Sequence, residues 1–262
     1  MKYKTLHELL SIQYGTTNNL ASYNSKTYLG SLLQVGIDIK KYLEAGLIQQ
    51  IPFDIKPRDK RKQYFYFVTR DGAKTIDRLD DYKQKITKSL NNAEHESMKS
   101  DIALSFIRNF PDYDFDFNYK ADLGGLKPDI LIKAKHINDH KEFTFLVEIE
   151  RKKEMTRIHR DKIYRYNKFI KNGLFEKHNF YKPKVLFVCS NLRYDPYTRP
   201  QQYNLPEVKK QIEIIDKHFN DLMELIKTES DKYFRLMKYY DYHRLGEKVC
   251  CLPSGSKVKI ID

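Results

Sequence analysis

The stretch that decides the fold is KPDILIKAKHINDHKEFTFLVEIERKKE, residues 127–154. It holds two apolar runs, residues 128–134 and 142–150, and a polar segment separates them. Runs of this length and composition are typical of β-strands, and the polar segment is typical of a turn. Three acids lie at the strand ends: Asp129, Glu148 and Glu150. Carboxylates are rarely buried without a partner, so their place on these strands needs an explanation.

Alternation along the second run sorts its side chains between two faces. One face receives Phe143, Phe145, Val147 and Ile149, and the other receives Thr144, Leu146, Glu148 and Glu150. Two carboxylates at neighbouring positions of one face repel each other, so we expect a cation close to them. If the two strands pair as a hairpin, Asp129 can approach both glutamates. The hairpin then brings three carboxylates together.

Converging carboxylates are the ligands that Mg²⁺ or Mn²⁺ prefers. A divalent cation would polarise a phosphodiester, lower the pKa of a bound water and neutralise charge in the transition state. The alternative is that both glutamates form ordinary ion pairs at a solvated strand end, with Lys133, Arg151 and Lys152. The residues alone leave both interpretations open.

The elements around this hairpin predict a mixed α/β core over residues 90–262. A helix is expected at residues 91–110, a strand at 114–120, a helix at 157–173, a buried strand at 184–191 and a long amphipathic helix at 205–227. The order α-β-β-β-α-β-α indicates a sheet flanked by helices. A Tyr-rich C-terminal extension, residues 231–262, is only weakly patterned and receives no assignment.

Residues 1–86 predict a separate DNA-binding domain. Three helical segments, residues 5–15, 16–23 and 38–46, precede two strand-like runs, 47–55 and 62–72, and the third helix is expected to stop at Gly46. This is the order of a winged helix-turn-helix, whose third helix enters the major groove while the wing lies along phosphates. The candidate DNA-binding residues are Lys40, Lys41, Arg58, Lys60, Arg61 and Lys62. The alternative is a small protein-interaction module with a solvated loop.

The charge of the chain favours a polyanionic partner. The 262 residues carry 48 Lys and Arg against 35 Asp and Glu, a net charge of +13. Residues 1–85 hold 15 cations against 9 acids and residues 86–262 hold 33 against 26, a spread that suits an extended polyanion such as DNA. The alternative is a Lys-rich solvated surface without a ligand.

Two further features bear on the cellular compartment. No run approaches 18 apolar residues, and MKYKTLHELL has no signal-peptide core, so we expect a cytoplasmic protein with no membrane partner. The cysteines, Cys189, Cys250 and Cys251, have no metal-ligand spacing and indicate a reducing compartment.

The element order and the motifs Pro128-Asp129 and Glu148-Ile149-Glu150 resemble the PD-(D/E)XK nuclease fold. A winged helix followed by KPDILI and FLVEIERKKE is also similar to the replication-relaxation family of plasmid and mobile-element proteins. That family includes MobC-type relaxases with a restriction-endonuclease-like core. Its strand motif, Glu-x-(Asp/Glu)-Arg and a later Glu, corresponds here to Glu148, Glu150, Arg151 and Glu154, and its helix His to His95. The resemblance spans residues 5–190.

The resemblance implies Asp129, Glu148 and Glu150 as metal ligands, but this chain has Glu150 where the nuclease motif expects Lys. Two lysines are candidates for the missing cation. Lys152 would restore a literal Glu-x-Lys, whereas Lys162 stands four residues before Tyr166, where related nucleases carry Gln-x-x-x-Tyr. Residues four apart share a helix face, so Lys162 and Tyr166 would both look over the strand ends.

The helix that follows the hairpin adds candidate DNA contacts: Arg157, Arg160, Arg165 and Tyr166. Its cations would track a DNA backbone, and Tyr164 and Tyr166 would stack on unpaired bases or pack half-buried. On the first helix of the core, Glu96 is a candidate fourth acid. His95 can equally be a capping or packing residue with no catalytic role.

From the sequence we expect a Mg²⁺- or Mn²⁺-dependent DNA endonuclease, a nicking relaxase that acts at the origin of a plasmid or mobile element. The alternative is a DNA-binding regulator with a degenerate, inactive nuclease fold. A protein-interaction adaptor is the third hypothesis, and it predicts no salt-dependent DNA affinity. DNA is the expected partner, and a homodimer stays open.

Overall fold

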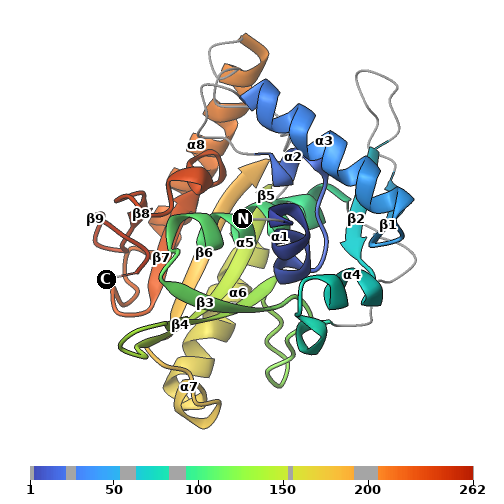
Figure 1. The fold of residues 1–262 in the computed structure, drawn as a ribbon. Helices are drawn as coiled ribbons and strands as arrows, with labels where there is room; N and C mark the ends of the chain where they lie inside the picture. The colour runs from blue at the N-terminus through green and yellow to red at the C-terminus, as the bar shows by residue number, and fades with distance from the viewer. Residues whose placement is uncertain are drawn as a thin grey trace. The chain divides into compact units, whose positions relative to one another are not determined.

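The computed structural model describes residues 3–21, 28–53, 63–82, 93–152, 156–191 and 206–261 (Figure 1). The chain divides into two compact units, Met1–Leu104 and Ser105–Asp262. The division falls inside helix α5 (Ala93–Asn109), so this helix contributes to both. The domain boundary that the sequence predicts, between residues 86 and 90, lies outside the described residues.

Unit 1 contains short helices and a hairpin. Its elements before α5 are α1 (Lys4–Ile12), α2 (Thr17–Leu20), α3 (Tyr28–Glu44), β1 (Ile48–Phe53), β2 (Gln63–Val68), α4 (Arg70–Thr75) and the 3₁₀ helix η1 (Leu79–Asp81). Strands β1 and β2 pair antiparallel, and Gly15 forms a further bridge with Tyr66. The predicted order of three helices and a hairpin is confirmed, although α3 begins ten residues earlier than expected and α4 was not predicted. The cationic loop at residues 56–62 lies outside the described residues.

Local sequence signals explain how the helices of unit 1 begin and end. The Thr16 side chain accepts a hydrogen bond from the Asn19 backbone N–H, and the Asn19 side chain accepts one from Thr16 N–H, which is a capping box at the start of α2. After α3 the chain turns at Gly46, whose φ of 69° lies in the left-handed region that favours glycine. The predicted helix stop at Gly46 is confirmed.

Unit 1 also holds a buried polar network that joins α2 to the first part of α5. The Asn19 amide donates to the Asp101 carboxylate at 2.8 Å and to the Ser97 hydroxyl at 3.1 Å. The Ser100 hydroxyl donates to the Tyr14 carbonyl at 2.8 Å. Buried polar groups are stable only when they are paired, so these contacts define one packing of α5 within unit 1.

Unit 2 is built on a seven-stranded sheet in the order β3-β4-β5-β6-β7-β8-β9 (Figure 1). Its strands are β3 (Tyr113–Asn118), β4 (Ile130–His136), β5 (Glu142–Lys152), β6 (Lys184–Asn191), β7 (Phe234–Lys238), β8 (Cys250–Cys251) and β9 (Lys257–Val258). Strands β3 to β5 are antiparallel, β5 to β7 are parallel, and β7 to β9 are antiparallel. The predicted α+β class with a mixed, helix-flanked sheet is confirmed.

Helices cover both faces of this sheet. The helices after β5 are α6 (Thr156–Lys171), α7 (Leu174–Lys177) and α8 (Pro206–Ile226). On one face, Tyr166 of α6 meets Phe187 edge to face, and Asp216 of α8 pairs with Lys238 at 2.8 Å. On the other face, Phe106 of α5 packs against Phe145 with ring centroids 5.1 Å apart. The 3₁₀ helix η3 (Tyr239–Arg244) lies next to the end of α5, where Ser105 donates to the Tyr242 carbonyl.

The central strands β5 and β6 are buried on both faces, as predicted for β6 from its continuous apolar run. Every side chain from Phe143 to Glu150 is buried, including both glutamates. Among the described residues, no helix is long and apolar enough to cross a membrane.

Gly72→Ala should destabilise unit 1. A Cβ at Gly72 would lie 2.1 Å from the Leu47 carbonyl oxygen, so the backbone itself must shift. We expect the free energy of unfolding, measured with urea, to fall by about 1–3 kcal/mol. The matched control is Gly36→Ala in α3, where a Cβ meets nothing within 4 Å and helix propensity predicts a gain of about 1 kcal/mol. Equal stabilities for the two variants would contradict this packing.

Candidate functional site

The β4–β5 hairpin brings the predicted carboxylates to one end of one sheet face. Ile130 pairs with Val147 in the antiparallel register, so Asp129 lies opposite Glu148. The Asp129 carboxylate accepts a hydrogen bond from the Ile149 backbone N–H at 2.7 Å, which holds it beside β5. Alternation then puts Glu148 and Glu150 on the face that α6 covers. The predicted hairpin, and the approach of Asp129 to this strand end, are confirmed.

Helix α6 supplies the cation and a hydroxyl. The Lys162 ammonium donates to Glu148 Oε2 at 2.6 Å and to Glu150 Oε1 at 2.5 Å. One turn further on, the Tyr166 hydroxyl donates to the other oxygen of Glu148 at 2.6 Å. Residues four apart share one face of a helix, and this spacing lets both donors reach a single strand end. Each Glu148 oxygen therefore has a partner.

Burial and charge shift the pKa values of this cluster. Burial raises the pKa of Glu148 to about 7, and the Asp129 charge adds to the rise, while Lys162 opposes it. Burial by itself would lower the pKa of Lys162, but the carboxylates of Glu148, Glu150 and Asp129 outweigh it and raise that pKa. Lys162 therefore stays a cation, and Glu148 changes charge near neutral pH. Perturbed groups of this kind concentrate at functional sites.

The structure places one of the two candidate lysines at the carboxylates. Lys162 is the cation that meets the carboxylates. Lys152 is the last residue of β5, and its side chain lies outside the described part of the chain, as do those of Arg151 and Glu154. The described side chains therefore show the contact of Lys162 and leave the role of Lys152 a prediction.

Tyr166 requires a correction. The sequence predicts Tyr166 as a DNA contact, but its side chain is 0% exposed and its hydroxyl is hydrogen-bonded to Glu148. A ring with no exposed surface cannot stack on a base. Its hydroxyl instead contacts Glu148, and the i, i+4 spacing with Lys162 is the sequence signal for that contact.

The other predicted DNA contacts include exposed side chains and residues outside the described structure. Arg160 and Arg165 of α6 are exposed, and Lys40 and Lys41 of α3 are exposed. Lys40 lies 4.0 Å from Glu44 as a surface ion pair. The side chain of Arg157 is not described, and the following residues lie wholly outside the described structure: Arg58, Lys60, Arg61 and Lys62.

The helix acid and histidine that the sequence singled out belong to unit 1. Glu96 accepts a hydrogen bond from the Tyr14 hydroxyl and pairs with Lys99 at 2.7 Å. These partners account for its carboxylate within unit 1. His95 is half-buried on α5. Their place in unit 1 supports packing roles for both.

One neighbour of the site was missed by sequence reasoning. Cys189 on β6 is registered with Glu150, and its thiol is fully buried. Burial, with the Glu150 charge adding to it, raises the pKa of Cys189 well above its usual value. The Cys189 thiol is therefore a neutral group next to Glu150. No spacing in the sequence links Cys189 to Glu150, because their contact is a parallel pairing between distant strands.

The site offers the type of ligand that a hard divalent cation prefers. Carboxylate oxygens from Asp129, Glu148 and Glu150 are the ligands that Mg²⁺ and Mn²⁺ take. In the structure the Lys162 ammonium lies between the two glutamates and neutralises them. In the described part of the chain, no three His, Cys, Asp or Glu side chains are grouped as a ready metal site. A metal would therefore bind these oxygens in competition with Lys162.

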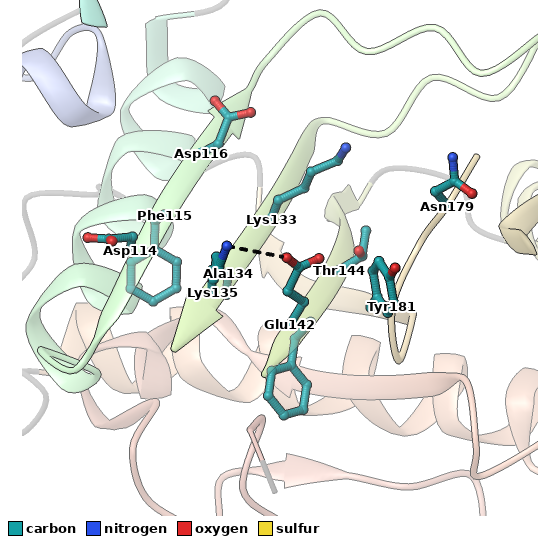
Figure 2. A pocket seen from close by; sticks show the side chains of 11 residues that line it. Asp114, Phe115, Asp116, Lys133, Ala134, Lys135, Glu142, Thr144, Asn179 and Tyr181 are labelled. Atoms are coloured by element: carbon teal, nitrogen blue, oxygen red, sulfur yellow. Dashed lines mark ion pairs between the residues drawn. The ribbon is translucent and has the colours of Figure 1, made fainter. Parts of the chain in front are cut away.

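A hollow of about 410 Å³ opens on the same sheet face, toward the β4–β5 turn (Figure 2). Figure 2 shows Lys135 and Glu142 facing each other, with Tyr181 and Asn179 on the neighbouring loop. Its lining mixes both signs of charge: Asp114, Asp116, Glu142, Lys133 and Lys135. Thr144 on β5 lies four residues before Glu148, about 13 Å along an extended strand. The hollow is thus distinct from the carboxylate cluster.

Comparisons of this chain with protein-family models, with curated proteins and with solved structures found no match. The geometry at the end of β5 is therefore the basis for a functional assignment.

Lys162→Met should lower the free energy of unfolding, because it leaves two buried carboxylates without a cation. The substitution keeps much of the side-chain volume but leaves Glu148 and Glu150 without their cation. We expect the free energy of unfolding at pH 8, measured with urea, to fall by about 3–5 kcal/mol. Lys168→Met, at an exposed position of the same helix, is the control and should change little.

The defect of Lys162→Met should shrink at pH 5. Loss of the ammonium raises the pKa of Glu148 further above its unfolded value of 4.5, so the folded state binds that proton more tightly. A carboxyl with a raised pKa stabilises the fold most when it is protonated, and this contribution is lost as the pH rises through the folded pKa. An equal defect at pH 5 and pH 8 would show that Glu148 is not the group left uncompensated.

Proposed function

We propose that this chain is a metal-dependent DNA endonuclease of the nicking type, with a PD-(D/E)XK-like site in unit 2. The observation that carries the proposal is the convergence of Asp129, Glu148 and Glu150 with Lys162 at one strand end. Carboxylates that hold a divalent cation can support phosphodiester hydrolysis, and a lysine beside them fits the resemblance to the PD-(D/E)XK pattern. The mixed sheet and the order α5-β3-β4-β5-α6-α7-β6-α8, which is the predicted order with the short helix α7 added, support the same fold type.

Each residue of the cluster has a proposed task. Asp129, Glu148 and Glu150 would hold Mg²⁺ or Mn²⁺, which when bound polarises the phosphodiester and lowers the pKa of its water. Tyr166 keeps Glu148 in one orientation through its hydroxyl. The Lys162 side chain is 24% exposed, so its ammonium can also donate to a phosphate oxygen or orient the attacking water. Fixed donors of this kind stabilise charge that develops in the transition state.

The same proposal assigns DNA recognition to unit 1. Its three helices and hairpin have the order of a winged helix. The exposed Lys40 and Lys41 on α3, with the cationic loop at residues 56–62, would contact phosphates. The resemblance to the replication-relaxation family favours the origin of a plasmid or mobile element as the target. A homodimer would fit a palindromic origin, whereas a monomer would fit a single site.

A second candidate function is DNA binding without cleavage. Lys162 already satisfies both glutamates, and Tyr166 and the Ile149 N–H engage the remaining groups. A cluster that neutralises itself can serve as a buried structural ion pair. This candidate predicts specific binding of origin DNA, no cleavage and no stabilisation by divalent cations.

A nicking assay on supercoiled plasmid that carries the candidate origin separates the two functions. We expect nicking with Mg²⁺ or Mn²⁺ and none with EDTA. Asp129→Asn and Glu148→Gln keep the hydrogen-bond acceptors for Ile149 and Tyr166 but remove the charge. Each should lower the nicking rate by about a hundredfold or more.

The control is Glu213→Gln, which removes an exposed carboxylate from α8. It should nick at the rate of the unsubstituted chain. Full nicking by both Asp129→Asn and Glu148→Gln would exclude this site. A specific gel shift with no nicking in any metal would favour the binding protein instead.

A further inference from the structure

The outer face of α6 has a composition that the carboxylate site does not explain. A helix repeats its faces every 3.6 residues, so Arg160, Tyr164, Lys168 and Lys171 follow one line along its surface. All four are exposed. The opposite face of the helix carries Lys162 and Tyr166, which point to the glutamates. One helix thus has a face occupied by the site and a cationic face open to solvent.

Tyr164 is unusual on this line. Its side chain is 67% exposed, and within the described residues it has no ring contact and no hydrogen bond. Tyr166, two residues on, is fully buried. The two tyrosines that the sequence could not tell apart therefore have opposite environments. An exposed aromatic ring with cations one turn away on both sides presents a stacking surface inside a positive field.

The charges around Tyr164 favour an anionic strand. In the described structure neither Arg160 nor Lys168 has a carboxylate partner. Each lies four residues from Tyr164, about 6 Å along the helix axis. Asp161 is the acid on this side, and its backbone carbonyl accepts a hydrogen bond from Arg165. The line therefore offers separate cations with a flat ring between them.

We propose that the outer face of α6 binds an unpaired DNA strand, with a base stacked on Tyr164 and phosphates on Arg160 and Lys168. This rests on the proposed function in that DNA is the substrate, and it names the substrate class as DNA with a single-stranded segment. A duplex keeps its base faces inside the stack and can offer this surface only phosphates. Every unpaired base has a face that can stack on the ring.

The position of this surface ties it to the site. Lys162 lies two residues before Tyr164 and belongs to the carboxylate cluster. The two faces of α6 are separated by about one helix diameter, roughly 10 Å. A strand held on Tyr164 is therefore within a few nucleotides of the glutamates. Unpaired DNA beside a cleavage position suits an origin that opens.

The test is fluorescence anisotropy in EDTA with a labelled thymidine oligonucleotide and with a labelled duplex of equal length. Tyr164→Ser should weaken binding of the single strand by about fivefold or more, because one base stack is lost. Tyr164→Phe keeps the ring and should bind like the unsubstituted chain. The duplex affinity should stay within about twofold for both variants, since phosphate contacts carry it.

Tyr181→Ser is the matched control. Tyr181 is 59% exposed, but it lines the mixed-charge hollow rather than the cationic line. Its loss should leave single-strand binding unchanged. Log affinity for the single strand falls as log salt concentration rises. Arg160→Gln and Lys168→Gln should each make that negative slope shallower by about 0.7.

Three results would overturn the inference: no binding of the single strand, no effect of Tyr164→Ser, or an equal loss on single strand and duplex. All variants are exposed, so thermal melting should match that of the unsubstituted chain. The measurement needs no metal and no cleavage. A negative result would therefore reject the strand-binding surface without bearing on the proposed nuclease activity. Selective loss by Tyr164→Ser without any nicking would support the surface and reject the endonuclease.

Discussion

The ion pairs of Lys162 with Glu148 and Glu150 are the constraint on which the functional end of unit 2 depends. Two carboxylates on one face of a buried strand are unfavourable unless a cation offsets both desolvation and repulsion. The ammonium lies 2.6 Å and 2.5 Å from their oxygens. These contacts therefore fix the position of α6 along its axis, and its rotation about that axis, where it crosses the end of β5. The same position and rotation of α6 bring the Tyr166 hydroxyl to Glu148.

This constraint gives α6 two different faces. Inward, its side chains complete a cluster in which Glu148 accepts from Lys162 and Tyr166. Outward, it leaves Tyr164 and a line of cations in solvent. A single helix can thus position carboxylates for chemistry and present a surface to a strand. The separation follows from helical geometry, because residues two apart point to opposite sides.

Much of the fold was predictable from local patterns. The hairpin β4–β5, the buried strand β6 and the long helix α8 each follow from apolar runs or helical periodicity. Strand β7 was not predicted, because FRLMK includes an arginine and has no alternation. Arg235 is buried there because its guanidinium donates to the carbonyls of Asp231 and Phe234. Both acceptors are local backbone carbonyls, one and four residues before Arg235, and their use by a buried guanidinium leaves no periodic signal in the sequence.

By itself, the sequence determined the acids, their parity on β5 and the four-residue spacing of Lys162 and Tyr166. These depend on the strand and helix periods, which are local. Only the tertiary structure decided that Lys162 meets both glutamates, that Asp129 is held by the Ile149 N–H, and that Cys189 lies beside Glu150. It also decided that Tyr166 is buried while Tyr164 is exposed. The physical reason is that register and helix rotation come from packing between distant segments, which no local period encodes.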